Sequence, residues 1–443
     1  MRLPANSASL QICRTHCRHC LRGKNYLRNS SSTRFLGNVN LAEYIPGVYI
    51  VAGKRTAIGK YGGVLRDVKP QDLFAAAARA AFEASGVPPE LVDTVNIGQT
   101  SSMSPGGLAP RHAALAAGVP REKPVVSTTL LSGSAINSTI LSTQEILIGS
   151  AHVSLAGGME VLSGVPFLVR GVRTGVPLGA NILLDDMNIS GLFDTYCKAT
   201  LIETSDKLAK KYGITRQGMD EFALRSQRYW KAAHDNGVFD AELVPVMGKF
   251  KGKDVLLSRD ESPRPNTTLE QLAKLPPIVA GSLLTAGNNC GINDGAGAII
   301  LASEDAVRQH KLKPLSRVAA WSRVGVDPTI MGIGLAVAAQ KLLDAACLRI
   351  DDIDLVEVHE TNAAVAVASV KHLGIEEKQL NLSGGAIAIG HPSGASGARL
   401  ISHITHELRR KHLRRGLASM CVAGGQGIAI LIKNADWEDN NHK

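Results

Sequence analysis

The chain has 443 residues, of which 44% are hydrophobic and 20% charged, so it is long enough to bury a large core and to hold more than one domain. No stretch approaches the roughly 18 consecutive apolar residues that a membrane-spanning helix requires, which excludes a transmembrane protein. The formal net charge is +10, a value that suggests nucleic-acid or membrane binding only if the charge lies on the folded part.

The positive charge is concentrated at the start of the chain. Residues 1–46 contain seven basic residues and one acidic residue, so the rest of the chain has a net charge of +4. This leader is rich in Arg and Ser and poor in acids, which is typical of a mitochondrial transit peptide. We therefore predict a transit peptide over residues 1–46 and a location in the mitochondrial matrix, with a disordered basic tail as the alternative. A peroxisomal signal is disfavoured because Ser9 stands where that signal has His or Gln, and the near-neutral body disfavours nucleic-acid binding.

Cysteine placement argues against metal sites and disulfides. Cys13, Cys17 and Cys20 lie inside the predicted leader, so we predict no metal site there. The four other cysteines are scattered, which suits a reducing compartment better than a disulfide framework: Cys197, Cys290, Cys347 and Cys421.

Strand and helix patterns alternate after the leader. Residues 48–51 read as a buried strand, and residues 71–85 as an Ala-rich helix entered through Pro70. This alternation predicts an α/β layered core.

The two halves of the chain resemble each other. Residues 86–97 are similar to residues 347–358, and each segment follows an Ala-rich helix, at an offset of 261 residues. The same offset sets Ser132 opposite Ser393, each opening a helical pattern after an apolar strand. We interpret this as an internal duplication, with two similar α/β units meeting face to face. Chance similarity of two βα units is the alternative.

The segment between the halves differs from them in composition and pattern. Residues 164–284 mix a Gly/Pro-rich loop, an amphipathic helix near residues 217–236 and a polar stretch. We predict that they form a loop region that covers the substrate, inserted in an N-terminal half of residues 47–310. Residues 311–443 would form the C-terminal half.

Two glycine-rich turns carry the residues best suited to chemistry. His391 lies at the apex of a strand-to-helix turn, framed by Gly390 and Pro392, which would fix its orientation. Cys421 ends a strand just before a glycine turn whose N–H groups are available to an oxyanion. A lone His is usually a packing residue and a buried Cys is usually inert, but the pairing of these two turns favours a catalytic role.

The chain resembles the thiolase family over residues 49–433. The resemblance rests on these two turns and on three further motifs that occur in the same order as in the family: Lys54-Arg55-Thr56, Thr285-Ala286-Gly287-Asn288 and Met331-Gly332-Ile333-Gly334. Within that family the spacing is most similar to the branch that cleaves 3-ketoacyl-CoA in mitochondrial fatty-acid β-oxidation. The resemblance implies a thiolase fold of five αβαβα layers. It also implies a two-step acyl transfer in which a cysteine thiolate attacks the 3-keto carbonyl and coenzyme A then collects the acyl group.

The resemblance further implies a role for individual residues. His391 matches the base that activates the nucleophile, Cys421 the second acid-base cysteine, and His359 the residue that holds an oxyanion-binding water. Arg264 and Thr267 match coenzyme A contacts, and Cys290 stands where the family has a serine that is expected to touch coenzyme A. Coenzyme A would be a substrate, with no permanently bound cofactor and no metal. A homo-oligomer, dimer or tetramer, is implied, and assembly with an active thiolase is a further possibility.

The nucleophile's position departs from the family pattern, because Ser132 stands where the family has its reactive cysteine. A hydroxyl is far harder to ionise than a thiol, whose free pKa is about 8.5. A helix dipole stabilises an anion by only about 0.3–2 kcal/mol, whereas each pK unit costs about 1.36 kcal/mol. Ser132 could act only if His391 took its proton during attack. We therefore expect weakened or altered thiolysis. Further departures surround the same pocket, at Ala135, Asn362 and Ala423.

Two hypotheses follow from these departures. The first is an active acyl-CoA enzyme of altered chemistry: a residual thiolase, an acyl-CoA hydrolase or another Claisen-type acyltransferase. The second is a catalytically silent paralogue that binds acyl-CoA or assembles with an active thiolase. The intact His391 and Cys421 favour the first, and the altered surroundings favour the second.

Overall fold

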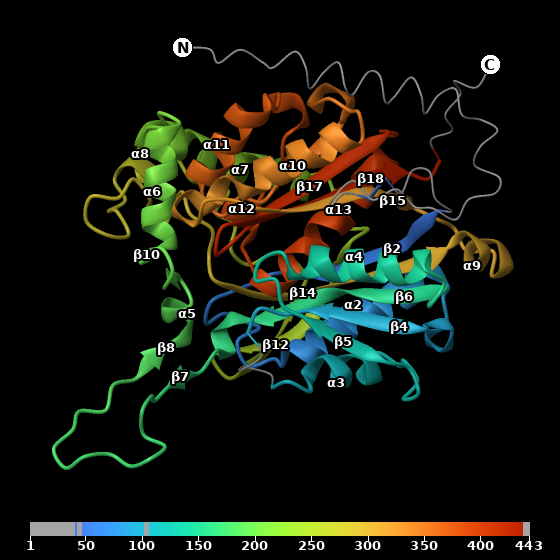
Figure 1. Ribbon diagram of the computed structural model, residues 1–443, viewed down its shortest axis with the longest axis horizontal. Helices are drawn as coiled ribbons and strands as arrows, with labels where there is room; N and C mark the ends of the chain where they lie inside the picture. Colours follow the sequence, from blue (N-terminus) through green and yellow to red (C-terminus); the bar gives the residue numbers. More distant parts are fainter. Residues whose placement is uncertain (1–39, 42–46, 102–105, 437–443) are drawn as a thin grey trace.

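The computed structural model describes residues 40–41, 47–101 and 106–436 (Figure 1). Its strands form one long path in the order β16-β17-β18-β15-β2-β14-β6-β4-β5. The path divides into two sheets that are joined at a narrow seam, where β2 and β15 pair antiparallel only through Ile50 with Ser316 and Tyr49 with Arg317. In Figure 1 the two sheets lie one above the other.

The two sheets have the same strand order. In the N-terminal sheet the strands are β5 (Val125–Thr128), β4 (Thr94–Gly98), β6 (Val153–Val161), β14 (Asn293–Ser303) and β2 (Val48–Thr56). In the C-terminal sheet they are β16 (Leu355–Val358), β17 (Arg415–Val422), β18 (Gln426–Asn434) and β15 (Ser316–Gly325). A bridge between Val356 and Leu380 takes the place of the outermost strand. β4 and β16 begin 261 residues apart, which is the offset seen in the sequence, so the α/β fold built from two similar halves is confirmed.

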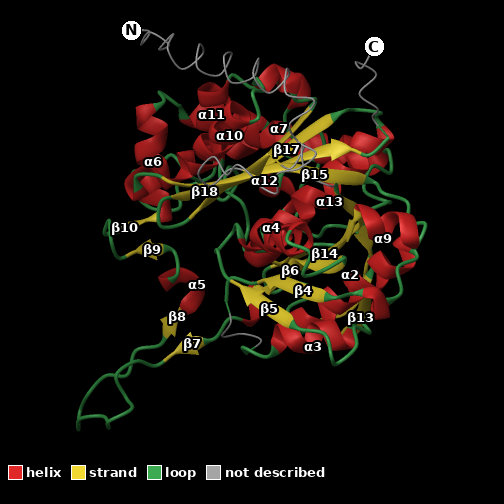
Figure 2. Cartoon of the chain, turned by 45° about the vertical axis from the view of Figure 1, so that its right-hand side comes forward, coloured by secondary structure: helices red, strands yellow, loops and turns green. Residues whose placement is uncertain are grey.

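Helices cover both sheets and fill the space between them (Figures 1 and 2). The outer helices of the N-terminal half are α2 (Pro70–Ser85) and α3 (Ala109–Ala116), and those of the C-terminal half are α10 (Gly334–Ala345) and α11 (Ala363–Leu373). Between the sheets lie α4 (Ser134–Leu147) and α13 (Ser396–Arg410). The order is therefore helix, sheet, helix, sheet, helix, which gives the five predicted layers.

Strand alternation explains why both faces of each sheet are covered. In β17, Leu417 and Cys421 belong to the core beneath the outer helices, whereas Ala418, Met420 and Val422 belong to the core around α4 and α13. Successive side chains of a strand point to opposite faces. A strand that is buried on both faces, as β17 is from Gly416 to Val422, therefore needs a helix on each side.

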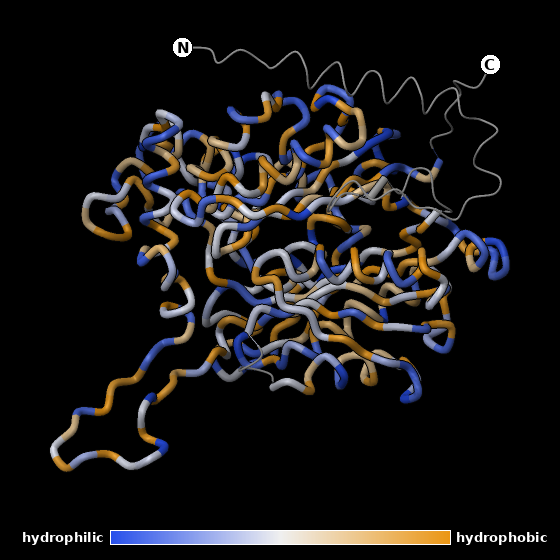
Figure 3. Tube along the Cα trace, viewed as in Figure 1, coloured by the Kyte–Doolittle hydropathy of each residue, from blue (hydrophilic) through white to orange (hydrophobic). Residues whose placement is uncertain are grey.

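The segment between the halves does not form one compact unit. Its helices α6 (Leu201–Lys211), α7 (Arg216–Asp235) and α8 (Leu269–Ala273) pack beside the C-terminal half, whereas the hairpin of β12 (Val246–Phe250) and β13 (Lys253–Leu257) joins the core of the N-terminal half. A long arm that includes β7 (Phe167–Leu168) and β8 (Asp185–Asp186) projects from the body (Figure 1). The arm carries exposed apolar residues, which appear orange in Figure 3.

Short elements complete the described chain. The strands are β3 (Gly59–Lys60), β9 (Phe193–Asp194), β10 (Ala199–Thr200) and β11 (Leu243–Val244). The helices are α5 (Met187–Ser190), α9 (Glu304–Gln309) and α12 (Ala386–Ile389). The 3₁₀ turns are η2 (Pro89–Leu91), η3 (Leu162–Gly164), η4 (Pro328–Ile333), η5 (Ile350–Asp352), η6 (Glu377–Gln379) and η7 (Ser393–Ala395).

One short strand lies inside the predicted leader. β1 (Asn40–Leu41) pairs antiparallel with β15, through Asn40 with Trp321 and Leu41 with Ala320. The remaining leader residues, including Cys13, Cys17 and Cys20, lie outside the described residues, so the transit peptide stays a prediction. In the part of the chain that the structure describes, no helix is long and apolar enough to cross a membrane.

Candidate active site

Ser132 lies in a sharp turn between β5 and α4. Leu131, just before it, adopts a left-handed backbone with φ of 44°, a conformation that a bulky residue rarely takes and that is often found at functional sites. The N–H of Gly133 closes the turn by donating to the carbonyl of Leu130 at 2.9 Å. Ser132 is thereby placed at the N-terminus of a 14-residue helix, where the partial positive charge of the helix favours a developing anion.

His391 lies in a second turn, which a neighbouring strand holds in place. Its backbone N–H donates to Oδ1 of Asn293 at 2.9 Å. Gly390 has a φ of 109°, and a Cβ at that position would lie only 2.5 Å from the Asn293 side chain. Only glycine fits there, which explains the residue that frames His391 in the sequence.

The two turns bring Ser132 and His391 together. The Ser132 Oγ lies 3.1 Å from Nε2 of His391, although the residues are 259 positions apart in the chain. The Nδ1 of His391 lies 2.7 Å from Oγ of Ser396. Burial, and to a lesser extent the charge of Arg399, lower the pKa of His391 to about 3, so the imidazole is neutral at physiological pH and one of its nitrogens holds a free lone pair.

Cys421 comes to the same place from the end of β17. It is 2% exposed, and its Sγ lies 3.1 Å from Oγ1 of Thr361. Its neighbour Val422 packs against the Ser132 turn, since a Cβ on Gly133 would lie 2.9 Å from the Val422 side chain. Burial raises the pKa of Cys421 to about 11. This thiol is therefore protonated at rest and suited to donate a proton rather than to attack.

His359 packs directly on the catalytic histidine candidate. Its ring centroid lies 4.1 Å from that of His391, and its side chain is fully buried. Burial first, and then His391 and Arg399, hold the pKa of His359 well below its ordinary value. Both ring nitrogens lack a hydrogen-bond partner among the described residues. An unpaired buried polar group is costly, so these nitrogens fit the predicted role of holding a water or an oxyanion.

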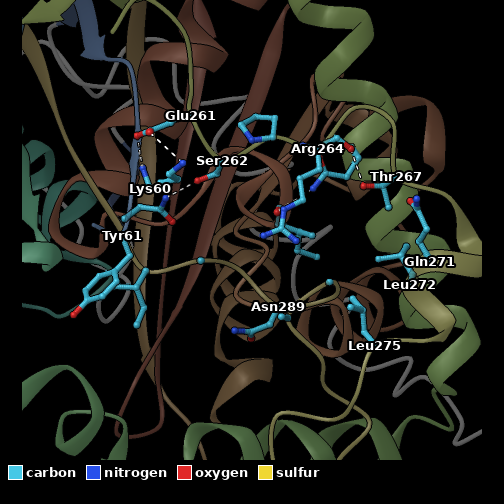
Figure 4. A pocket seen from close by; sticks show the side chains of 18 residues that line it. Lys60, Tyr61, Glu261, Ser262, Arg264, Thr267, Gln271, Leu272, Leu275 and Asn289 are labelled. Atoms are coloured by element: carbon cyan, nitrogen blue, oxygen red, sulfur yellow. Dashed lines mark hydrogen bonds and ion pairs between the residues drawn. The ribbon is translucent and has the colours of Figure 1, made fainter. Parts of the chain in front are cut away.

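A cavity of about 550 Å³ is lined in part by Asn293, the residue that holds the His391 turn, but not by Ser132, His391 or Cys421. In Figure 4, Lys60 and Tyr61 lie on one side of it, and Arg264 and Thr267 on the opposite side. The Arg264 side chain is exposed and has no ion-pair partner in the described chain. An unpaired guanidinium on the wall of a cavity suits a phosphate group, and both predicted coenzyme A contacts on this wall line the same space.

One extended segment separates the cavity from the catalytic turns. Asn289, Gly291 and Asn293 line the cavity. Cys290 does not line it: its N–H donates to the carbonyl of Thr361 at 3.1 Å, on the catalytic side. Burial, followed by the charge of Cys421, raises the pKa of Cys290 to about 12. The predicted contact of this thiol with coenzyme A therefore remains a prediction, and the structure places Cys290 near enough to Cys421 for the two thiols to influence each other.

Asn362 has a structural explanation within the fold. Its side-chain oxygen accepts from the N–H of Val365 at 3.0 Å and so caps α11, while its Nδ2 donates to Oγ of Ser205 at 2.9 Å. Both halves of the amide are thus satisfied without a ligand. The other departures lie at the turns themselves, with Ala135 fully buried in α4 and Ala423 directly after β17.

Sequence reasoning did not assign a role to three hydroxyl groups near the site, those of Ser393, Thr100 and Ser396. The Ser393 Oγ lies 3.3 Å from Oγ of Ser132 and accepts from Oγ1 of Thr100 at 2.9 Å. The Ser396 Oγ lies beside Nδ1 of His391. The duplication held the signal for Ser393, because the offset of 261 residues pairs it with Ser132, and equivalent residues meet where two similar halves pack face to face.

Comparison with known proteins decides the family. Residues 48–305 match the thiolase N-terminal domain, and residues 312–434 match the thiolase C-terminal domain. The chain belongs to the thiolase family. Its thiolase relatives include the bovine mitochondrial 3-ketoacyl-CoA thiolase, with 44% identity over 88% of this chain and 98% of the relative. An acetyl-CoA acetyltransferase of Cupriavidus necator is 39% identical over 87% of this chain and 99% of that protein.

Solved thiolase structures agree with the fold. The crystal structure of human mitochondrial 3-ketoacyl-CoA thiolase has a TM-score of 0.86 and 43% identity, covering 88% of this chain and 99% of the human one. The structure of the same human thiolase in complex with CoA has a TM-score of 0.85 at 43% identity, covering 88% and 98%. The predicted thiolase fold is thereby confirmed.

Proposed function

We propose that this thiolase-family chain is an acyltransferase that acts on 3-ketoacyl-CoA thioesters, with Ser132 as the nucleophile, His391 as its base and Cys421 as the second acid-base group. The observation that carries the proposal is the 3.1 Å contact between the Ser132 Oγ and Nε2 of His391. A nucleophile within hydrogen-bond reach of a neutral imidazole is the arrangement that base-assisted attack requires.

Coenzyme A is the proposed substrate carrier. The cavity with the unpaired Arg264 is connected to the His391 turn through Asn293, which lines the cavity and bonds to that turn, and the human relative is known in complex with CoA. His359 would bind the oxyanion water. We propose no permanently bound cofactor and no metal, and a matrix location on the strength of the leader and of the mitochondrial relatives.

We further propose that the chain assembles as a homo-oligomer. The projecting arm exposes large apolar side chains, among them Leu178 and Leu183, which are 106% and 80% exposed. Apolar groups gathered on a projection suggest a surface that is covered in an assembly. Sedimentation of the wild type and of a Leu178→Asp/Leu183→Asp variant tests this, since only the variant should shift to a smaller species.

Thiolysis by the native chain should be weak, because a hydroxyl is a poorer nucleophile and leaving group than a thiol. The test measures coenzyme A-dependent cleavage of acetoacetyl-CoA by the wild type, Ser132→Cys and Ser132→Cys/His391→Ala. We expect Ser132→Cys to raise the rate by at least about 100-fold, and His391→Ala to remove that gain. A Ser132→Cys variant that folds, binds coenzyme A and still fails to cleave would contradict the proposed active site.

The second candidate is a silent paralogue that binds acyl-CoA or assembles with an active thiolase. It is favoured by the nucleophile itself, because neither the Ser132 hydroxyl nor the Cys421 thiol is ionised at rest. Coenzyme A binding measured by calorimetry, without any turnover of acyl-CoA, would support this candidate.

A further inference from the structure

The hydrogen bonds around His391 fix which of its nitrogens carries the proton. The hydroxyl of Ser396 donates to the carbonyl of Pro392 at 3.1 Å. A hydroxyl has one proton, so when Ser396 donates that proton to Pro392 its oxygen accepts from His391, and Nδ1 carries the hydrogen of the 2.7 Å contact. In the neutral ring Nε2 then holds a lone pair, and the Ser132 hydroxyl donates to it.

On the other side of Ser132, a chain of hydroxyl groups also donates towards His391. Thr100 donates to Oγ of Ser393 at 2.9 Å, which leaves the Ser393 proton free to be donated to Oγ of Ser132 at 3.3 Å. Ser132 thus accepts one hydrogen bond while it offers its own proton to His391. A donor aimed at the attacking oxygen stabilises the negative charge that develops on it. This surrounding suits a hydroxyl nucleophile.

The chemistry of an acyl group on serine decides where that group goes next. Transfer from a thioester to a hydroxyl runs downhill, because an oxygen ester is resonance-stabilised more strongly than a thioester. The return of the acyl group to coenzyme A is uphill for the same reason, and the serine oxygen is a poor leaving group towards a thiol. Attack by water is favourable, and His391 can accept its proton as histidine does in serine hydrolases.

We infer that this chain hydrolyses acyl-CoA thioesters through an ester formed on Ser132, an inference that rests on the acyl-CoA specificity proposed above. In the first step the Ser132 oxygen bonds to the acyl carbon, its proton passes to Nε2 of His391, and the carbon–sulfur bond breaks. The coenzyme A sulfur leaves with that proton. In the second step water attacks the ester, gives a proton to Nε2, and the carbon–oxygen bond to Ser132 breaks as the serine regains a proton. The sum is acyl-CoA plus water to free acid plus coenzyme A.

The experiment measures release of coenzyme A thiol from acetyl-CoA and acetoacetyl-CoA by the full chain, with no coenzyme A added. The variants are Ser132→Ala, Ser132→Cys and Ser393→Ala, and the matched control is Ser258→Ala at an exposed position outside the site. We expect Ser132→Ala to lower hydrolysis by at least about 100-fold, Ser393→Ala to lower it several-fold, and Ser258→Ala to leave it unchanged. Mass spectrometry of quenched protein should find the acyl group on residue 132, resistant to neutral hydroxylamine in the wild type and labile in Ser132→Cys.

The outcomes separate this inference from the proposed function. Thiolysis by Ser132→Cys without hydrolysis by the wild type would overturn the inference and leave the proposed active site standing. Hydrolysis that persists in Ser132→Ala would also overturn it, because water would then attack the thioester directly. No reaction from either protein, despite native folding by circular dichroism, would overturn both. Loss of wild-type hydrolysis in Ser132→Ala, with the acyl-serine detected, supports the inference.

Discussion

The residues at the proposed site divide into those that we propose carry protons and those that hold these residues in place. His391 is neutral because it is buried near Arg399, and its orientation depends on Ser396 and on the backbone contact with Asn293. The motifs in the sequence predicted His391 and Cys421, because glycine turns leave a local pattern. They could not predict Thr361 beside Cys421 or Thr100 behind Ser393, since those contacts join segments that only the packed sheets bring together.

The lowered pKa of His391 makes a prediction for stability. The unfolded imidazole titrates near 6.5 and the folded one near 3, so the unfolded state binds more protons between these values. The stabilising contribution is therefore present above pH 6.5 and is lost as pH falls towards 3. Urea unfolding at pH 7.5 and pH 4.5 should show that the wild type loses more stability than His391→Asn over this range. Equal losses in the two proteins would contradict the buried neutral imidazole, and His310→Asn, at an exposed position, serves as the control.

At the scale of elements, helix starts and strand ends carry the site. The sequence predicted helices over the segments that follow Ser132 and Ser393, and the structure has them as α4 and α13. It predicted a covering role for residues 164–284 but not that they divide between the two halves. That division depends on which apolar faces remain uncovered after the sheets pack, and no local pattern records it.

Asn362 tests the capping of α11. Its side chain accepts from the N–H of Val365, so Asn362→Ala leaves that N–H unpaired and also removes the bond to Ser205. We expect a loss of about 1–2 kcal/mol in the free energy of unfolding, measured by urea denaturation. Asn362→Asp keeps the acceptor and should recover part of the loss. An Asn362→Ala variant with an unchanged free energy of unfolding would show that the cap contributes nothing.

Glu160 at the end of β6 ties the segment after β4 to the His391 turn, because its Oε2 accepts from the N–H groups of Thr100 and Gly394 at 2.7 and 3.0 Å. Burial raises its pKa to about 7 despite these bonds. The stability that it contributes is fully present below about pH 4.5 and is lost as pH rises through 7. The melting temperature of Glu160→Gln, compared with that of the wild type at the same pH, should therefore be more favourable at pH 8 than at pH 5. A melting temperature of the variant that falls relative to the wild type between pH 5 and pH 8 would mean that the carboxylate is the stabilised form.

At the scale of the whole molecule, a row of buried charges joins the inserted region to both halves. Arg55 of β2 bonds to Asp260 at 2.7 Å and to Glu242 at 2.6 Å, and Glu242 lies 3.0 Å from His403 of α13. The row continues through Glu357 of β16 to its ion pair with Arg399, with a bond of 3.0 Å. Every one of these side chains is at most 4% exposed. Three carboxylates face two guanidinium groups, so protonation of His403 would make the row neutral.

The position of His403 in this row makes a prediction for how the stability of the protein depends on pH. Burial alone would lower its pKa, but Glu242, Glu357 and Glu407 outweigh burial and raise it. Stability from this group is fully present below about pH 6.5 and is lost as pH rises through the folded pKa. His403→Gln should destabilise the protein more at pH 6 than at pH 9.5 in urea unfolding, while the exposed His412→Gln should not. An equal cost at both values would argue against a charged His403.

Ser132 and Ser393, 261 positions apart, face each other across the centre of the molecule with 3.3 Å between their oxygens. Such a contact of equivalent residues is what a symmetric pair of separate chains makes at its twofold axis, so the two halves of this single polypeptide meet as two subunits of a dimer would. The link between its halves follows α9, whose Ala306 packs in the core of the N-terminal half. A gene cut between residues 310 and 313 should yield two fragments that reassemble when co-expressed, with the site rebuilt at their boundary.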